Sequence, residues 1–410
     1  MVQPIRILTS DFEPLGQTEQ YVSMMFTKSW HGVGEFDFVI HRDANGADQI
    51  KKGTMLALAK NKVGIVRHRE IQLDQNGKIT ENWLFKGSTL KGIAKQRITI
   101  PPAHTAYDTI TADAETVIKH YVYNHLVNPT DPARAIPNLI IAPNQNRGGR
   151  VNWQSRFKNV AEELEEISLA TDIGWDITLD TTNNQFIFDV FEGNNLSVNQ
   201  SENSPVYFSP EFGNVKQQSF SDSDLNMRNV GYIAGQGEGV ERIVVEIGDE
   251  SGINRHETFV DARDIGGEDE DGNEYTEEEE EQLLIERGEQ RMREMENQMF
   301  FEAEIMSPVS KITYEEHYKT MVSHAQPVYD RQKKTELVAP FRYEHDFNLG
   351  DKVTIMNRDW GFIVDRRITE FTEVHEANGF RLDAVFGQKR PDLISKMQTK
   401  FSEYDHELKR

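Results

Sequence analysis

The sequence predicts an α+β fold that is rich in β-strands. Apolar residues recur at every second position in many short segments, which is the period of a half-buried strand. Turn-forming Gly and Asn residues separate these segments. Helical spacing is confined to a few stretches, and we therefore expect β domains that carry small α/β insertions.

Residues 1–100 are expected to form a first β domain of the barrel or sandwich type. In residues 35–40 (EFDFVI) the apolar side chains alternate with the others, as in a strand. Gly32 and Gly34 precede this segment and suit a turn or a bulge. Further along, Asn76-Gly77 lies between two short apolar segments, and this dipeptide predicts a hairpin.

Residues 101–204 change character and are expected to form an α/β insertion of two helices and a hairpin. Pro101-Pro102 stops the preceding strand. Helical spacing of apolar residues from Ala114 to Leu126 predicts the first helix, with Asp113 as its N-cap and Pro129 beyond its end. The hairpin is predicted at residues 175–191, where WDITLD and QFIFDVF flank the turn TTNN.

The second helix of this insertion is predicted from about Trp153 to Ala170, with Asn152 as its N-cap. Its glutamates lie mostly off the apolar face. The expected apolar stripe consists of Phe157, Val160, Ala161, Leu164 and Ile167.

Residues 205–345 are expected to form a second β domain, in which Val230–Ala234 and residues 242–247 are strands on either side of GQGEG. An acidic run begins at Glu268, ends at Glu281 and holds ten acids without a base. We interpret most of it as a solvated loop, with a cation site or a basic partner as alternatives. A helix is predicted at 277–299, with the apolar stripe Leu284, Gly288, Met292, Met295 and Met299.

The end of the chain is expected to complete the β structure. Residues 346–390 contain further strand-like segments, including LGDKVTIMN and WGFIVDRRI. Residues 391–410 form a polar tail.

Familiar catalytic and ligand-binding motifs are incomplete in this sequence. GQGEG (235–239) is followed by a strand-like segment, whereas the dinucleotide fingerprint G-x-G-x-x-G opens a helix, so we predict a turn. His41-Arg-Asp43 matches three letters of a kinase loop whose other parts are missing. His120 and His125 are five residues apart and so lie on different faces of a regular helix, as solvated or core-edge side chains. Asp222-Ser-Asp224 lacks the Glu at position twelve of an EF-hand, so we predict a polar loop there. We therefore assign no catalytic, cofactor-binding or metal-ligating residue.

The formal charge of −23 excludes a duplex-binding protein, which needs a basic face to release counterions from phosphate. The sequence has no cysteine, which excludes disulfides, thiolate zinc sites and cysteine nucleophiles. No apolar run approaches the roughly 18 residues of a membrane span, and no secretory signal precedes the first strand. We expect a protein that is made and folded in the cytoplasm.

Four sets of segments, in a fixed order, together span nearly the whole chain. They are Lys28-Ser-Trp30 with residues 34–38 (GEFDF); Gly174-Trp175 with 187–193 (IFDVFEG); 229–248 (NVGYIAGQGEGVERIVVEIG) with 257–265 (ETFVDARDI); and 347–355 (FNLGDKVTI) with 381–391 (RLDAVFGQKRP). As an ordered set, they resemble the ReqiPepy-type family of siphophage tail proteins.

The resemblance implies a hub at the distal end of a phage tail, similar to the N-terminal module of tail-associated lysins (Tal) and to myophage baseplate hubs. Such hubs have two related barrel-like β domains side by side, with small insertions. Three copies form a ring of pseudo-sixfold symmetry that adapts a hexameric tail tube to a threefold tip. The implied partners are two further copies, the distal tail protein, the tape-measure protein and other tail-tip or receptor-binding proteins. No lysin or receptor-binding extension is visible after the hub segment.

The first functional hypothesis is therefore a non-enzymatic, homotrimeric ring of the virion that closes the tail tube and lets DNA pass during ejection. An acidic lumen would repel DNA, whereas a basic lumen would hold it. The alternatives are a carbohydrate-binding protein for host adsorption and a cell-wall hydrolase, either a glycosidase or a peptidase.

Overall fold

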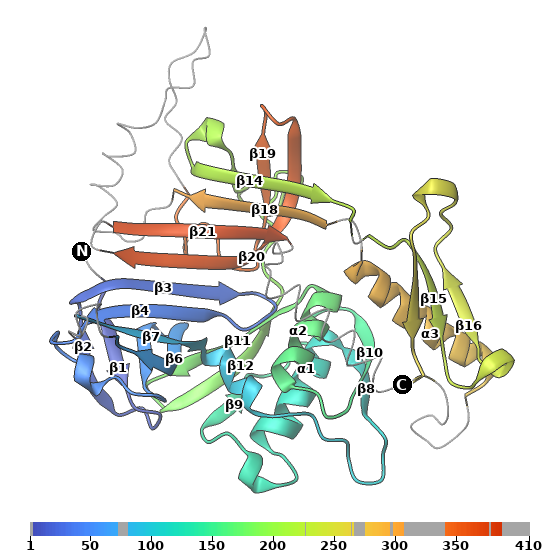
Figure 1. Cartoon of the computed structure of the whole chain (residues 1–410), viewed down its shortest axis with the longest axis horizontal. Helices are drawn as coiled ribbons and strands as arrows, with labels where there is room; N and C mark the ends of the chain where they lie inside the picture. Colours follow the sequence, from blue (N-terminus) through green and yellow to red (C-terminus); the bar gives the residue numbers. More distant parts are fainter. Residues whose placement is uncertain are drawn as a thin grey trace. The chain divides into compact units, whose positions relative to one another are not determined.

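The structure is a computed structural model, which describes residues 3–72, 81–225, 227–263, 265, 275–295, 298–306, 341–376 and 379–387. It divides into two compact units. The large unit comprises residues 1–219 and 301–410, and the small unit comprises residues 220–300. The secondary structure confirms the predicted β-rich α+β class (Figure 1).

The strands in chain order are β1 (Ile5–Leu8), β2 (Pro14–Thr18), β3 (Tyr21–Ser29), β4 (Glu35–His41), β5 (Met55–Ala59), β6 (Lys62–Glu70), β7 (Asn82–Thr89), β8 (Asp108–Asp113), β9 (Leu139–Ile141), β10 (Arg150–Ser155), β11 (Gly174–Asp180), β12 (Gln185–Phe191), β13 (Tyr207–Phe208), β14 (Val215–Ser223), β15 (Val230–Ala234), β16 (Val244–Ile247), β17 (Glu257–Asp261), β18 (Gln298–Ile305), β19 (Lys352–Asn357), β20 (Phe362–Glu376) and β21 (Gly379–Gly387). The α-helices are α1 (Ala114–Val122), α2 (Val160–Thr171) and α3 (Glu277–Glu294). The short helical segments are η1 (Ala47–Gln49), η2 (Leu90–Gln96), η3 (Tyr123–Val127), η4 (Pro132–Arg134), η5 (Pro210–Phe212), η6 (Gly239–Glu241) and η7 (Gly252–Asn254).

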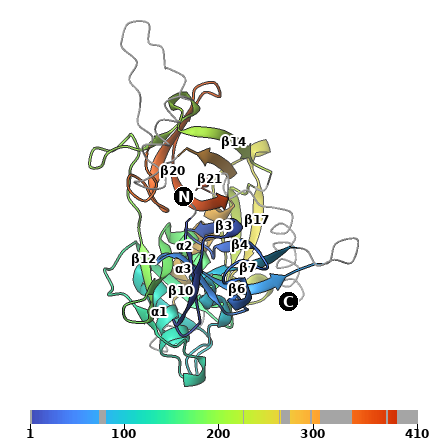
Figure 2. The same cartoon turned by 90° about the vertical axis from the view of Figure 1, so that its left-hand side faces the viewer.

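One long sheet joins the two ends of the chain in the large unit. Its strand order is β14-β18-β21-β20-β3-β4-β7-β6-β5-β1-β2, with β19 and β13 attached beside β20. The N-terminal block (β1 to β7) meets the C-terminal block (β13, β14 and β18 to β21) where β3 pairs antiparallel with β20, from Ser23↔Glu376 to Ser29↔Glu370. Figures 1 and 2 both show β20 and β21 next to β3 and β4. The strand order is an open path, so the described strands do not close into a barrel.

The N-terminal block is built on the predicted alternation. Phe36, Phe38 and Ile40 are buried, while the residues between them are not. β6 and β7 pair antiparallel as the hairpin prediction requires, although the Asn76-Gly77 turn itself lies outside the described residues. Gly34 lies in the connection from β3 to β4, where a Cβ would be 2.0 Å from the Thr27 carbonyl oxygen. This close approach explains the glycine in the predicted turn.

Both faces of the N-terminal sheet are covered, because successive strand residues point to opposite sides. Leu56 and Val66 belong to the core inside the block. Met55 and Ile65 belong instead to a core shared with the α/β segment, which comprises β8 to β12 with α1 and α2. The C-terminal block has a separate core rich in phenylalanine.

The α/β segment confirms the first helix and the hairpin. The Asp113 side chain accepts a hydrogen bond from the Thr116 amide at 2.9 Å, so Asp113 is the N-cap of α1. Before Pro129 the helix continues as the π-helical turn η3. β11 and β12 pair antiparallel in the predicted hairpin, and β9 adds to β12 in parallel.

The predicted start of the second helix is wrong. Trp153 lies in β10, which pairs with β8, and α2 begins only at Val160 with Asn159, not Asn152, as its N-cap. Trp153 is buried in the strand, where its indole N–H donates to Glu163 of α2. Phe157 is exposed and outside the helix, whereas the remaining members of the predicted stripe are buried.

The small unit is a three-stranded sheet with α3 against one face. β15 and β16 pair antiparallel, so GQGEG is the predicted turn between strands. α3 starts at the predicted residue, and Thr276 and Glu279 form a capping box there. The helix ends at Glu294 rather than at residue 299, because Met299 lies in strand β18. Residues 268–274 of the acidic run, and the tail 391–410, lie outside the described residues.

The glycine in the α3 stripe marks a close contact with the sheet. A Cβ at Gly288 would lie 2.3 Å from Ile247 Cδ1 and 2.5 Å from Ile233 Cγ1. Helix α3 can therefore approach β15 and β16 only because this position has no side chain.

We predict that Gly288→Val destabilises the small unit by about 2–3 kcal/mol, because the new side chain overpacks this contact. Gln282→Val on the exposed face of α3 is the control for helix propensity and should cost less than about 1 kcal/mol. Hydrogen exchange of the α3 amides measures both effects. Equal protection in the two variants would contradict the packing argument.

Candidate functional site

Trp30 lies at a junction where three parts of the large unit meet. Its side chain is only 5% exposed. A Cβ on Gly174 of β11 would lie 2.4 Å from the indole, and a Cβ on Gly350, before β19, would lie 2.0 Å from it. The indole is therefore held between two stretches of bare backbone. These three residues come from three of the four segments that carry the family resemblance.

Arg367 of β20 connects the C-terminal block to the α/β segment at the same junction. Its guanidinium donates to both carboxylate oxygens of Asp172, at 2.8 and 2.7 Å, and to the Glu192 carbonyl at 2.7 Å. It also lies 5.4 Å from the Trp30 ring centroid. Two parallel hydrogen bonds between the planar guanidinium and the Asp172 carboxylate fix the orientation of the two groups as well as the distance between them.

Lys91 of η2 is buried beside the backbone of Ser29 and Trp30. Its ammonium donates to the carbonyls of Ser29 at 2.9 Å and Trp30 at 3.2 Å, and it lies 4.1 Å from the Trp175 ring centroid. Burial lowers the pKa of Lys91 to about 7, against the attraction of Asp176 and Glu165. The ammonium thus anchors the turn that follows β3.

Trp175 and His31 make further contacts that hold the turn after β3. The Trp175 indole N–H donates to the His31 carbonyl at 2.7 Å. Burial lowers the pKa of His31 to about 4, so the ring is neutral at pH 7 and pairs with the Ser168 hydroxyl at 2.8 Å. Lys28 forms an ion pair with Asp176 at 3.0 Å.

A buried ion cluster reinforces the seam between β3 and β20. Lys62 of β6 lies 2.6 Å from a carboxylate oxygen of Glu373 and 2.8 Å from one of Glu344. His375 contacts the other oxygen of Glu373 at 3.2 Å. Burial raises the pKa of Glu373, but the His375 hydrogen bond and the Lys62 charge outweigh it and lower that pKa to about 2. The carboxylate is therefore ionised in the folded protein at neutral pH.

The two histidines of the α1 region lie on one side, contrary to the prediction. His120 and His125 contact the two carboxylate oxygens of Asp108, at 2.7 and 3.1 Å. The reason is the π-helical turn at Tyr123–Val127, since i→i+5 bonding brings residues five apart into line. Burial raises the pKa of Asp108, and the hydrogen bonds with both histidines outweigh this effect and lower it to about 2. Among the described residues, no group of three or more His, Asp and Glu is arranged to hold a metal ion.

The other motifs occupy surface positions. His41 ends β4, and Arg42 and Asp43 form the turn that follows it. Asp222 lies at the end of strand β14 rather than in a loop, and Asp224 follows the strand.

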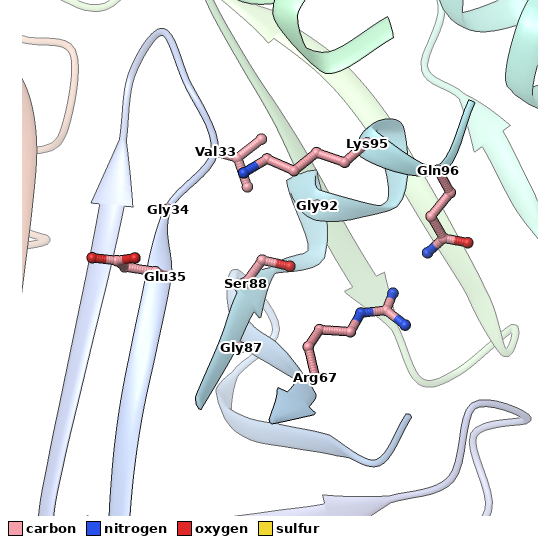
Figure 3. Close-up of a pocket in the computed structure, with 9 residues that line it drawn as sticks. All are labelled: Val33, Gly34, Glu35, Arg67, Gly87, Ser88, Gly92, Lys95 and Gln96. Carbon is pink, nitrogen blue, oxygen red and sulfur yellow. The ribbon is translucent and has the colours of Figure 1, made fainter. Parts of the chain in front are cut away.

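A recess of about 380 Å³ opens beside the N-terminal block (Figure 3). Its lining residues are Val33, Gly34, Glu35, Arg67, Gly87, Ser88, Gly92, Lys95 and Gln96. Glu35 is the only carboxylate among them, whereas glycoside hydrolysis generally uses a pair of carboxylates. Two cationic side chains, Arg67 and Lys95, also line the recess.

The model of the Siphovirus ReqiPepy6 Gp37-like protein family matches residues 4–320 and 331–388. The chain belongs to this family. It is thus a siphophage tail protein, as the ordered segments predicted. The junction explains why those segments occur together, because three of them supply Trp30 and the two glycines against it.

No helix among the described residues is long and apolar enough to cross a membrane.

Solved structures of tail proteins share the fold across nearly their whole length. The 43 kDa tail protein of prophage MuSo2 from Shewanella oneidensis is 11% identical, with a TM-score of 0.54, and the match covers 94% of this chain and 98% of that one. A tail protein from Neisseria meningitidis is 10% identical, with a TM-score of 0.52 and coverage of 94% and 96%. No curated protein matched the sequence.

Sequence reasoning could point to Trp30 and its two glycines only through the resemblance. It gave no indication of Arg367, Lys91 or Lys62, because a basic residue that pairs in the interior looks in sequence like any solvated lysine or arginine. Asp172 is 195 residues from Arg367, and Glu373 is 311 residues from Lys62 along the chain. No local pattern records such separations.

We predict that Gly350→Ala destabilises the large unit far more than Gly53→Ala. Both glycines have left-handed backbone, with φ of +89° and +91°, so both substitutions cost about 1–2 kcal/mol of backbone strain. Only Gly350 faces Trp30, whereas a Cβ at Gly53 meets no atom within 4 Å. Thermal unfolding should show an additional loss of about 2 kcal/mol or more for Gly350→Ala. Equal melting temperatures would show that Trp30 does not require the bare backbone.

We predict that Glu373→Gln costs about 3 kcal/mol at pH 7 by leaving Lys62 under-compensated. The folded-state pKa of Glu373 is lowered from 4.5 to about 2, so its stabilisation is complete above pH 4.5 and is lost as the pH falls toward 2. The melting temperature of the wild type should therefore fall more steeply over this range than that of the variant. Asp37→Asn, which breaks the exposed pair with Lys86, is the control and should cost at most about 1 kcal/mol. Parallel pH profiles for wild type and Glu373→Gln would contradict the assignment.

Proposed function

We propose that this tail protein is a non-enzymatic hub, three copies of which form a ring at the tip of the tail tube. The observation that carries the proposal is the extent of the likeness. The family match spans nearly the whole chain, and the fold similarity covers 98% and 96% of two tail proteins. The described fold is thus accounted for by the tail-protein scaffold.

The arrangement of the central sheet supports a ring built from paired blocks. The strand order β4-β3-β20-β21 places one antiparallel pair from each block side by side, with β3 and β20 antiparallel at the seam. The N-terminal block thus contributes the pair β4-β3 and the C-terminal block the pair β20-β21, and the two pairs meet through antiparallel strands. Three chains with two such blocks each would offer six similar elements to a hexameric tube, as the resemblance implies.

The charge suits a passage for DNA. Each chain carries −23, and a ring of three carries three times that charge. DNA moving through an acidic lumen would be repelled rather than held by counterion release. The neighbours in this proposal are the distal tail protein, the tape-measure protein and other tail-tip proteins, and the place of action is the tail tip of the virion.

We predict that the purified chain forms a trimer. Native mass spectrometry over a range of concentrations should give a species of three chains, and averaged images of tail tips should show a threefold ring with an acidic lumen. A monomer at every concentration that is also absent from virions would contradict the proposal, and so would a basic lumen. A zymogram on host cell walls and binding to whole host cells distinguish the hydrolase and adsorption alternatives.

A further inference from the structure

A basic and apolar patch lies on the α/β segment, next to the start of α2. The patch consists of Arg97, Ile98, Ile100, Arg134, Arg156 and Phe157. Its three apolar side chains are well exposed, Phe157 at 57%, Ile98 at 43% and Ile100 at 39%. Exposed single hydrophobic residues are ordinary, but a group of three beside one another indicates an interaction surface.

The backbone places these side chains on one face. Ile98 bridges to Asn159 antiparallel, and the Phe157 amide donates to the Thr99 carbonyl at 3.0 Å. Phe157 thus lies across from Thr99, whose two neighbours in the chain are the exposed Ile98 and Ile100, while the Thr99 side chain itself is fully buried. The alternation therefore directs Thr99 into the core and both isoleucines to the surface.

Phe157 is held in this position at a conformational cost. Its φ is +50°, a left-handed conformation that is unfavourable for a bulky side chain. A buried network fixes the loop around it. The Thr99 hydroxyl pairs with the Ser155 hydroxyl at 2.7 Å, and Ser155 donates to Glu163 at 2.7 Å. The chain thus maintains a strained backbone in order to present an aromatic ring to solvent, which points to a function for that ring.

The patch also contains three arginines. Arg97 donates to the Arg134 carbonyl at 2.6 Å, and Arg134 donates to the Ile98 carbonyl at 2.5 Å. Arg156 lies 5.3 Å from the Phe157 ring centroid and 5.9 Å from that of Tyr107. Within the described part of the chain, no carboxylate forms an ion pair with any of the three. Burial and the charge of Arg97 lower the pKa of Arg134, against the opposing charge of Asp131.

The chain has 68 acids against 45 lysines and arginines, so this cluster is opposite in sign to the net charge. Arginine and aromatic side chains are enriched at protein interfaces, where they supply much of the binding energy. The complementary surface is acidic with an apolar centre. The chain's own excess of acids makes a second copy the partner with that chemistry.

We propose that this patch binds a neighbouring copy of the same chain. The inference rests on the proposed ring, and it adds the surface through which one copy contacts the next. Copies that each carry −23 repel one another, so they associate best where a local basic surface meets the acidic surface of a neighbour.

The test compares variants of the full chain by analytical ultracentrifugation. Phe157→Asn removes the ring but keeps a residue that tolerates left-handed backbone, so it should raise the dissociation constant about tenfold or more while the melting temperature is unchanged or higher. Arg156→Glu should weaken association mainly at low salt. Trp360→Asn is the control, because Trp360 is 50% exposed outside the patch and its loss should leave association unchanged.

Each outcome separates this inference from the proposed function. A wild-type trimer that persists undiminished in Phe157→Asn and Arg156→Glu would overturn the assigned surface and leave the ring intact. A wild-type chain that is monomeric at every concentration would overturn the ring, and the assigned surface with it. Binding of a fluorescent single-stranded oligonucleotide that is lost in Arg156→Glu, without an effect on self-association, would assign the patch to nucleic acid and overturn the proposal.

Discussion

The antiparallel pairing of β3 with β20 is the interaction on which the large unit depends. It joins residues from opposite ends of the chain, and without it the N-terminal and C-terminal blocks would each expose a sheet edge. Bringing such distant segments together has an entropic cost that rises slowly with loop length. That cost falls once the α/β segment is folded, because Arg367 and Trp30 then have preformed contacts on it.

At the pairing of β3 with β20 and at the Trp30 junction, buried charges fix the relative position of the segments more than they add to net stability. Replacing a buried ion pair with apolar residues is often neutral or stabilising, whereas breaking one is costly. Lys62 between Glu373 and Glu344, and Lys91 on two carbonyls, thus specify one register and one approach of the blocks. In the proposed ring, two blocks that face symmetric neighbours would need such a fixed arrangement.

Local elements could be predicted from the sequence because their causes are local. Asp113 caps the first helix, the hairpin at β11 and β12 follows its turn, and GQGEG connects two strands. The error at Trp153 arose because apolar spacing continues from β10 into α2, and only the pairing of β10 with β8 distinguishes strand from helix there. The error at His120 and His125 arose because a π-helical turn changes the helical period without a sequence signal. The seam itself depends on contacts over hundreds of residues, which a single sequence does not encode in any local pattern.

Because α2 starts later than predicted, Phe157 becomes part of the exposed patch proposed above. Had Phe157 been part of α2, it would have been one more residue of an apolar stripe. Because α2 begins after it, the residue falls in a loop whose buried hydroxyls and Glu163 fix its backbone, and its ring is left outside the core. The strained backbone of Phe157 is maintained because the surrounding hydrogen bonds hold the loop in one conformation. A surface made this way is already ordered, so it loses little further conformational freedom when a partner binds, which favours the proposed association of copies that each carry −23.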